Sequence, residues 1–474
     1  MNILIKSEML LLHQRWILCI SLLGFLLTGV LFYPYGITRD SQATFVAVYL
    51  GYDTNASWVG INNWMGWFTP LLWKSLYHWT GLNHAIGILH NSLYWVSMTA
   101  IYINIFPKTA SRRLFASYHY WFVLFAFFPP VLCMLTNITN NVLLLSFIAA
   151  ALASLSFYSI TLSKMPVVAA IVLLLPATFI RRDAVIFIFP MVICLGAILS
   201  NRRVLSSAVV GFVFFLGFFG INKLVSSRID GYSKTIHSTE VISLFDFVGM
   251  SLFKQELIIP EPLLRDEFHG ANGSEVLKCI NCFEDIYNDH YFYHGFEVTK
   301  KPYWTCGLTL KDAIPVYLAN WPTYLQFRAN FLWRYFTRTG LLAESAYFNH
   351  DLLKIMQVDA YPMMSWPQIK LQSLRVKAGG WFRSAFPFTH KLWFYLGISI
   401  GCLGLLFRQK PGDSLPDGMK GFLLFLICLI WFSVGVLCIA SVVVQLRYPF
   451  AYAFFVWPVF VYLLRMVVIT RNEH

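Results

Sequence analysis

A single carboxylate, Asp40, stands where the first apolar segment of the chain gives way to a long polar and aromatic loop. Residues 15–35 are apolar over a length that can cross a bilayer, and GITRDSQ follows at 36–42. A carboxylate in this place can stay hydrated and still meet a substrate held in the membrane. Asp40 could therefore act as a general base that takes a proton from an attacking hydroxyl. Alternatively, residues 38–41 suit a helix start, with Asp40 as its cap.

Several arginines are expected on the same side of the membrane as Asp40, although basic residues prefer the cytoplasmic side. A guanidinium can hold a phosphate through two parallel hydrogen bonds, so such residues are candidate ligands of a lipid phosphate. The structural alternatives carry similar weight, because an arginine here could pair with Asp183, reach lipid headgroups, or anchor a helix at the interface. The candidates for phosphate binding are Arg181, Arg182 and Arg447, and Arg39 lies next to Asp40.

The loop at 37–83 is rich in tryptophan and long for a connection between two spans, and long loops often carry function. Its apolar residues fit helices that lie flat on a membrane, with tryptophans either anchoring them at headgroup level or stacking on sugars. Asp53 is a second carboxylate, but it suits a turn equally well. The candidates for substrate binding are Arg39, Asp53, Trp64 and Trp67.

Composition places the chain among polytopic membrane proteins. Of 474 residues, 58% are hydrophobic and 12% are charged, and mean hydropathy is +0.61, whereas soluble domains are about 25% charged. The net charge of +13 arises mainly from short loops and one external segment, and no nucleic-acid motif is present. The first apolar segment lacks a small-residue cleavage site, which favours a retained helix over a signal peptide.

We expect an all-α membrane fold of about ten transmembrane helices. Placing most Lys and Arg residues of short loops on the cytoplasmic side puts both termini there as well. Prolines punctuate the fifth and sixth spans, so a pair of broken or re-entrant helices is an alternative there. The expected spans are 15–36, 84–106, 114–135, 139–161, 166–181, 184–200, 204–224, 388–407, 420–442 and 447–466.

Three parts follow from these spans: an N-terminal membrane module at 1–224, an external cap at 225–387 and a C-terminal membrane module at 388–474. Within the cap, 243–253 and 315–336 are expected to form amphipathic helices, so the cap should be mostly helical and rest on the membrane. Its charged residues are expected to be solvated or to cap helices; these are Glu240, Asp246, Lys254, Glu256 and Glu261.

Cysteines and histidines give no metal site. The cysteines in apolar spans are expected to be small core residues; these are Cys19, Cys133, Cys194, Cys402, Cys428 and Cys438. In the cap, Cys279, Cys282 and Cys306 suit one disulfide with one thiol left over, without fixing which two pair. His78, His84 and His90 lack the spacing of a metal-binding set.

The order of these features resembles the GT-C-type membrane glycosyltransferases, which have an acidic residue in the first external loop, interfacial helices and a later external domain. Further stretches resemble bacterial members of that group. The protein O-mannosyltransferase pattern of an Asp-Glu pair after the first span is missing, which argues against a protein acceptor. The stretches that carry the resemblance are YPYGITRDSQ at 33–42, WFTPLLWKSLYHWTG at 67–81, FFPPVLCMLTN at 127–137, FIRRDAVIF at 179–187 and LRYPFAYAF at 446–454.

The resemblance implies transfer of a sugar from a polyprenyl-phosphate donor to a surface or lipid-linked glycan, on the external face and with inversion. Asp40 would be the base, arginines would stabilise the leaving phosphate, and the cap would hold the acceptor. No cofactor is required, although a divalent metal is compatible with the scheme. The implied setting is the bacterial inner membrane and cell-envelope polysaccharide biosynthesis, such as O-antigen modification, beside a flippase and a donor synthase.

Two other functions fit the same residues. A transporter or flippase of a lipid-linked or anionic solute would need ionisable residues deep in its spans or paired broken helices, and the span centres are nearly free of charge. A glycan polymerase or ligase that uses the same lipid carriers would employ the external arginines equally well. A purely structural membrane protein is disfavoured by those arginines and by the Asp40 loop.

Overall fold

The computed structural model describes the greater part of the chain, and all structural statements below concern those residues. They are 2–32, 35–37, 67–82, 84–105, 135–138, 140–161, 163–180, 204–228, 238–260, 310–337, 366–407 and 417–440, with stretches of one to three residues at 122–123, 127, 131–132, 184, 188–189, 191–193, 195, 264 and 460.

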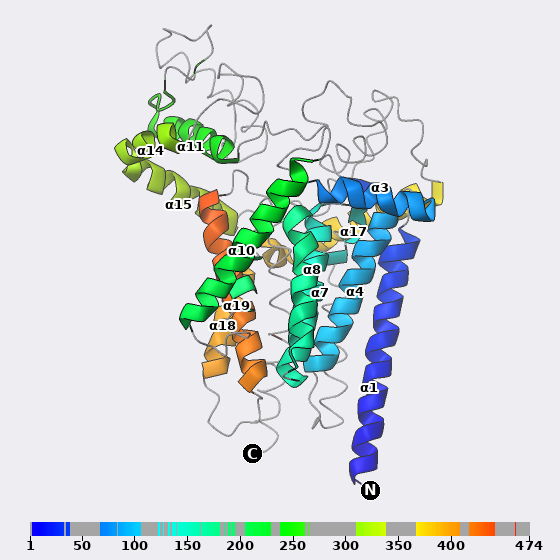
Figure 1. Ribbon diagram of the computed structural model, residues 1–474. Helices are drawn as coiled ribbons and strands as arrows, with labels where there is room; N and C mark the ends of the chain where they lie inside the picture. The colour runs from blue at the N-terminus through cyan, green and yellow to red at the C-terminus, as the bar shows by residue number, and fades with distance from the viewer. Residues whose placement is uncertain are drawn as a thin grey trace.

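Long helices that run roughly alongside one another form the body of the described structure (Figure 1). Two strands of two residues each are the only strands among the described residues, so the expectation of a mostly helical fold is confirmed. The long helices are α1 (Asn2–Phe25), continued by the π-helical turn η1 (Leu26–Leu31), α4 (Ala85–Ile105), α7 (Asn140–Thr161), α8 (Met165–Ile180), α10 (Val204–Ser226), α18 (Leu392–Phe407) and α19 (Asp417–Ala440).

These helices occur where the first, second, fourth, fifth, seventh, eighth and ninth spans were expected. Helix α8 continues through Pro176, so the segment expected as the fifth span forms one helix and not a broken one. The third and tenth expected spans, 114–135 and 447–466, and the sixth, 184–200, lie largely outside the described residues.

One described helical window, Gln14–Leu31, is both long and apolar enough to cross a bilayer, and only 28% of it is buried inside the protein. Other apolar helices in the described residues are shorter, at 10–17 residues, and include Met165–Ile180 and Leu392–Phe407. An apolar helix near the N-terminus thus supports association with a membrane. Ten membrane crossings stay a prediction.

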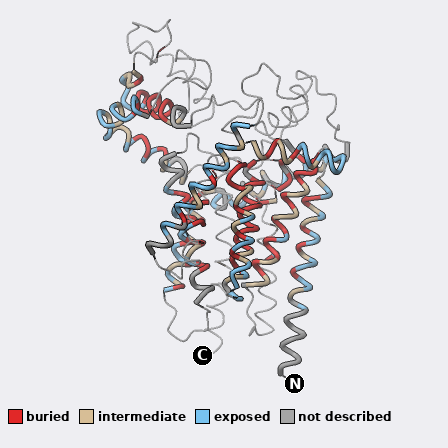
Figure 2. Tube along the Cα trace, viewed as in Figure 1, coloured by how far each residue is buried: buried red, intermediate tan, exposed pale blue. Residues whose placement is uncertain are grey.

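Helix α7 lies at the centre of the bundle. Every residue from 142 to 153 is buried, and the helix packs against α4, α8 and α19. Figure 2 shows the buried residues concentrated along these central helices. A helix that is apolar on all sides belongs in a core, and the run Ala149–Ala151 allows its neighbours to approach closely. The central position of α7 joins the N-terminal helices to α19 of the C-terminal module.

Polar side chains connect α1 and η1 to α4 within this apolar setting. The Trp95 indole N–H donates to the Thr28 hydroxyl at 2.9 Å, and the Thr99 hydroxyl donates to Ser21 at 2.6 Å. Since a buried donor without an acceptor is unfavourable, these bonds fix how the two helices face each other. Gly24 lies under the Trp95 ring, where an added Cβ would overlap the ring.

Two helices lie across the long ones. Helix α3 (Phe68–Thr80) crosses one end of the bundle, and α17 (Trp366–Ala385) also runs across the bundle near that end (Figure 1). Helix α3 confirms a helix in the tryptophan-rich loop and ends at Gly81, whose φ of +67° suits glycine. Trp73 is buried beneath α3, whereas Trp79 is exposed.

The cap places three helices beyond the same end of the bundle: α11 (Ser238–Lys254), α14 (Leu310–Ala319) and α15 (Trp321–Thr337) (Figure 1). The amphipathic segment expected at 315–336 is divided at Asn320, whose side-chain amide donates to the Val316 carbonyl at 3.1 Å. Pro322 follows, and because proline has no N–H it starts the first turn of α15 and does not continue α14.

The expectation for the cysteines was correct in one described case and wrong in two. Cys402 is buried, but Cys19 and Cys428 are exposed on the outer surfaces of their helices. Apolar spans can present small residues outward as well as inward, so apolar context alone did not indicate the direction. Cys133, Cys194, Cys438 and the three cap cysteines have no described side chain.

We predict that Gly24→Ala lowers the thermal stability of the detergent-solubilised protein. The added methyl would overlap the buried Trp95 ring, which its bond to Thr28 holds in place, and overpacking of this kind costs roughly 1–3 kcal/mol. Gly217→Ala in α10 is the matched control, because nothing lies within 4 Å of its added Cβ. Equal unfolding temperatures for the two variants would contradict the packing described for Trp95.

Candidate functional site

The chain that leads to Asp40 is held by a short strand pair. Strand β1 (Gly36–Ile37) follows the first helix, and strand β2 (Asn137–Ile138) precedes α7. They pair in parallel, with Gly36 opposite Asn137 and Ile37 opposite Ile138. Strand β1 ends three residues before Asp40 in the sequence, so this pairing fixes the start of the candidate loop.

Two neighbouring side chains of α4 hold the segment that contains β2. The His90 Nε2 lies 3.0 Å from the Leu135 carbonyl oxygen, and the Asn91 side-chain amide donates to the same oxygen at 3.0 Å. Asn91 also donates to the Gly87 carbonyl at 2.9 Å. Because Leu135 O accepts, His90 must carry its proton on Nε2. Buried polar groups need such partners, and both side chains are fully buried.

Tyr35 fixes the residues just before β1. Its hydroxyl donates to the Gly29 carbonyl, and its ring lies 5.9 Å from the ring of His90. The ring covers Gly87, where an added Cβ would overlap it. His90 was considered in the sequence only as a metal ligand, and its structural contact to Leu135 was missed. The adjacent polar residues His90 and Asn91 in an apolar helix were the signal that both side chains need hydrogen-bond partners inside the protein.

Trp67 ties the end of the aromatic loop to two long helices. Its indole N–H donates to the Asn222 side chain of α10 at 2.8 Å, and its ring lies 5.0 Å from Phe179 of α8. The next residue, Phe68, meets Phe147 of α7 edge-on at 6.3 Å. Phe179 is the last residue but one of α8, and Arg181 follows that helix directly. The start of α3 and the end of α8 are therefore fixed together.

Trp67 is the one candidate site residue with a described position; Arg39, Asp40, Asp53, Trp64, Arg181, Arg182 and Arg447 lie outside the described residues. The described elements that precede them are β1, α8 and α19. Helix α8 ends at the same end of the bundle as α3, and the end of α19 lies there too, where α19 contacts α15 (Figure 1). The described elements that lead into the candidate segments thus end at the same end of the bundle (Figure 1).

The cap contains a buried ion pair that sequence reasoning missed. Asp246 of α11 is 1% exposed and Arg328 of α15 is 7% exposed, with 2.6 Å between Arg328 Nη2 and Asp246 Oδ1. The Tyr317 hydroxyl donates to Asp246 Oδ2 at 2.8 Å. The expectation that Asp246 is solvated or caps a helix was wrong. A lone acid in the apolar run SLFDFVGMSLF was the available signal, since aspartate is rarely buried without a partner.

Aromatic rings surround the Arg328 guanidinium. Its central carbon lies 5.7 Å from the ring centre of Phe245, 5.9 Å from that of Tyr324 and 5.4 Å from that of Phe331. Rings at these distances attract a cation through their negative faces. The charge of Arg328 is therefore balanced by one carboxylate and by several rings, which joins α11 to α15.

Burial raises the pKa of Asp246 to about 6, while the charge of Arg328 and the bond from Tyr317 act in the opposite direction. Burial likewise raises the pKa of Tyr317 and of Tyr324. Asp246 is therefore ionised at neutral pH, and both tyrosines stay protonated. With Asp246 almost fully buried, this cluster joins α11, α14 and α15.

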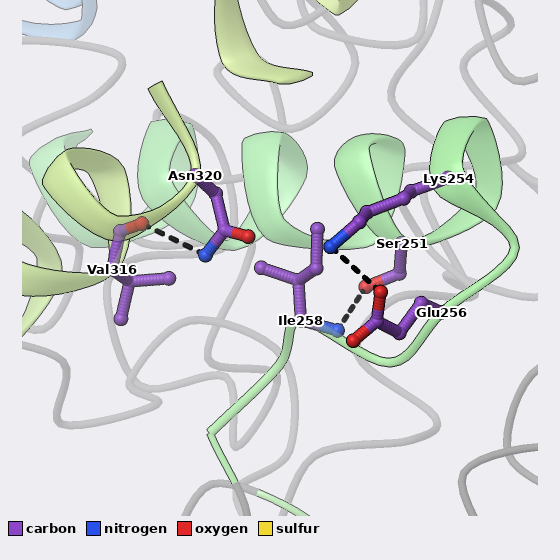
Figure 3. Close-up of polar contacts among 6 residues, drawn as sticks. All are labelled: Ser251, Lys254, Glu256, Ile258, Val316 and Asn320. Carbon is purple, nitrogen blue, oxygen red and sulfur yellow. Dashed lines mark hydrogen bonds and ion pairs between the residues drawn. The ribbon is translucent and has the colours of Figure 1, made fainter. Parts of the chain in front are cut away.

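The turn that leaves α11 has its own set of bonds (Figure 3). The Lys254 ammonium and the Glu256 carboxylate form an exposed ion pair of 2.6 Å, as expected for solvated residues, and Ser251 Oγ accepts from the Ile258 N–H at 2.9 Å. Gln255 between them has a φ of +56°. These contacts end α11 and position the chain that follows it.

We predict that Arg328→Met destabilises the cap far more than a paired replacement does. Removing one partner leaves a buried charge alone, at about 3–5 kcal/mol, whereas replacing both partners with apolar residues is often close to neutral. The comparison is between Arg328→Met and the double variant Asp246→Leu/Arg328→Met, followed by limited proteolysis of the cap. A double variant that is cut faster than the single one would refute the pairing.

We predict a pH dependence of cap stability that Asp246 controls. The folded pKa of Asp246, about 6, lies above its ordinary value of 3.8, so its favourable contribution is complete below pH 3.8 and is lost as pH rises through about 6. Hydrogen exchange of α11, corrected for intrinsic rates, should therefore speed up over this range and level off above it. The double variant Asp246→Leu/Arg328→Met, which leaves no buried charge unpaired, should remove the difference; an identical profile in both proteins would contradict this assignment.

The described part of the site consists of the paired strands, the ends of helices and buried hydrogen-bonded side chains. Within the described residues, no group of three or more His, Cys, Asp or Glu side chains is placed to hold a metal ion. Comparison with models of protein families, with curated proteins and with solved structures gave no match.

Proposed function

We propose that the chain is an integral-membrane glycosyltransferase that moves a sugar from a polyprenyl-phosphate donor to a surface or lipid-linked glycan on the external face. The observation that carries this proposal is the common location of the elements that lead into the candidate segments. Strand β1 precedes Asp40, and α8 precedes Arg181 and Arg182; both are held at one end of the bundle by buried side chains.

The proposed chemistry follows from the types of residue at this end. An acceptor hydroxyl attacks the anomeric carbon, and Asp40 takes its proton as the new C–O bond forms. The bond from the anomeric carbon to the phosphate oxygen breaks, and the electron pair leaves with the polyprenyl phosphate. Guanidinium groups from Arg181, Arg182 and Arg447 would stabilise this developing charge most strongly in the transition state. Attack opposite the leaving group inverts the anomeric centre.

The proposed placement has ten spans, cytoplasmic termini and an external cap. Support comes from the helices at seven of the expected positions and from Gln14–Leu31, which is apolar and long enough to cross a bilayer. The cap helices lie beyond the end of the bundle opposite the N-terminus (Figure 1). That arrangement would put the cap, α3 and the candidate segments together on the external side, where a flipped donor is available.

We predict that Asp40→Asn lowers sugar transfer by about 10²–10⁴-fold, the contribution typical of general-base catalysis. Membrane vesicles that carry the protein would be supplied with a panel of synthetic polyprenyl-phosphate hexoses and with envelope glycan as acceptor. Sugar transferred and polyprenyl phosphate released would be measured together. Glu256→Gln is the control, because Glu256 is an exposed carboxylate whose described contact is the Lys254 ion pair.

The same vesicles, supplied in parallel with a polyprenyl-diphosphate-linked glycan, separate the competing functions. Equal turnover by Asp40→Asn and wild type, at equal protein level, would remove Asp40 from the chemistry. A transporter or flippase would move the lipid-linked sugar without releasing polyprenyl phosphate from it. A polymerase or ligase would release polyprenyl diphosphate from a diphosphate-linked glycan, and would leave the monophosphate hexoses unused.

A further inference from the structure

Helix α17 carries only positive charge. Its twenty residues, WPQIKLQSLRVKAGGWFRSA, include four basic residues and no acidic one. Under the proposed placement this helix is external, where the preference of basic residues for the cytoplasmic side does not account for such a cluster. The basic residues are Lys370, Arg375, Lys377 and Arg383.

One exposed stripe of α17 mixes charge with apolar surface. Lys370, Leu374, Lys377 and Trp381 follow one another at spacings of four, three and four residues, which places them on one side of a helix. All four are exposed, with 61% of Leu374 and 69% of Trp381 accessible. A water-facing helix side would seldom alternate lysines with leucine and tryptophan. Lysines above apolar side chains suit the boundary between headgroups and acyl chains.

Further exposed apolar residues follow α17 along the chain. The 3-10 turn η5 (Pro387–His390) packs against both α17 and α18, and Phe386 and Phe388 are exposed beside it. On α18 itself, Trp393, Ile400 and Phe407 are exposed. Helix α17 runs across the long helices and α18 runs with them (Figure 1), and η5 joins the two, so exposed apolar residues occur on both sides of this turn.

We propose that α17 docks on the anionic surface of the external leaflet, with Lys370 and Lys377 on lipid phosphates and Leu374 and Trp381 below the headgroups. The occupant is the bilayer and not a protein partner, because the apolar residues of the stripe alternate with lysines and further exposed apolar residues follow on η5 and α18. The proposal rests on the membrane placement given under the proposed function, but not on sugar transfer. Attraction of basic residues by anionic lipid supplies the charge dependence.

The test uses the full chain in lipid nanodiscs of phosphatidylcholine, with and without 30% phosphatidylglycerol, prepared with acyl chains brominated near the headgroup. The fluorescence difference between wild type and Trp381→Phe isolates Trp381. We expect bromine to quench Trp381, and quenching to rise about twofold when phosphatidylglycerol is present. In the Lys370→Gln/Lys377→Gln background the rise should disappear, whereas Lys164→Gln, an exposed lysine between α7 and α8, should retain it.

Trp16 provides the internal reference for membrane placement, because it is exposed within the Gln14–Leu31 window. Its signal is isolated in the same way with Trp16→Phe. Quenching of Trp16 without quenching of Trp381 would overturn the docking of α17 alone. Quenching of Trp381 that ignores both phosphatidylglycerol and the lysine variants would overturn the role of charge. Absence of quenching at both positions would overturn the membrane placement itself, and the docking of α17 with it.

Discussion

The backbone carbonyl of Leu135 is the point on which the arrangement at the candidate end depends. Leu135 is helical and lies two residues before the strand β2, and its carbonyl at this change of structure needs partners in an apolar setting. His90 and Asn91 supply them from the middle of an apolar helix. With that carbonyl held, β2 can present its edge to β1, and the chain that enters the Asp40 loop acquires a defined start. Tyr35, seated over Gly87, holds the same chain from its other side.

The cap uses a different solution to a similar problem. Its helices α11 and α15 pack against each other around an interior that contains charge. Arg328 faces one carboxylate and several rings, so that neither charged group is left without compensation. Phe327, which lies over Gly249, brings α15 close to α11 beside this pair. Close backbone approach and charge pairing therefore act at the same place.

The sequence predicted the positions of the long helices well, because a twenty-residue apolar run has few other structures open to it. It predicted the helix in the tryptophan loop because the apolar residues there fit a helix that lies flat on a membrane. It missed the Asp246–Arg328 pair, since the partners are 82 positions apart and local spacing carries no record of such a pairing. It also placed Cys19 and Cys428 in the core, because composition alone does not give the direction of a side chain on an apolar helix. The roles of Asp40 and the external arginines stay predictions, and among the candidate residues only Trp67 has a described environment.

The burial of α7 on all sides links the first half of the chain to its last quarter. Helix α15 packs on α18 and α19, α19 packs on α7, and α7 packs on α4 and α8. The first half of the chain therefore lacks part of its own interior until the last quarter has been synthesised. The packing of α7 therefore draws on both ends of the chain. During synthesis, the side of α7 that α19 covers would stay unfilled until α19 is made.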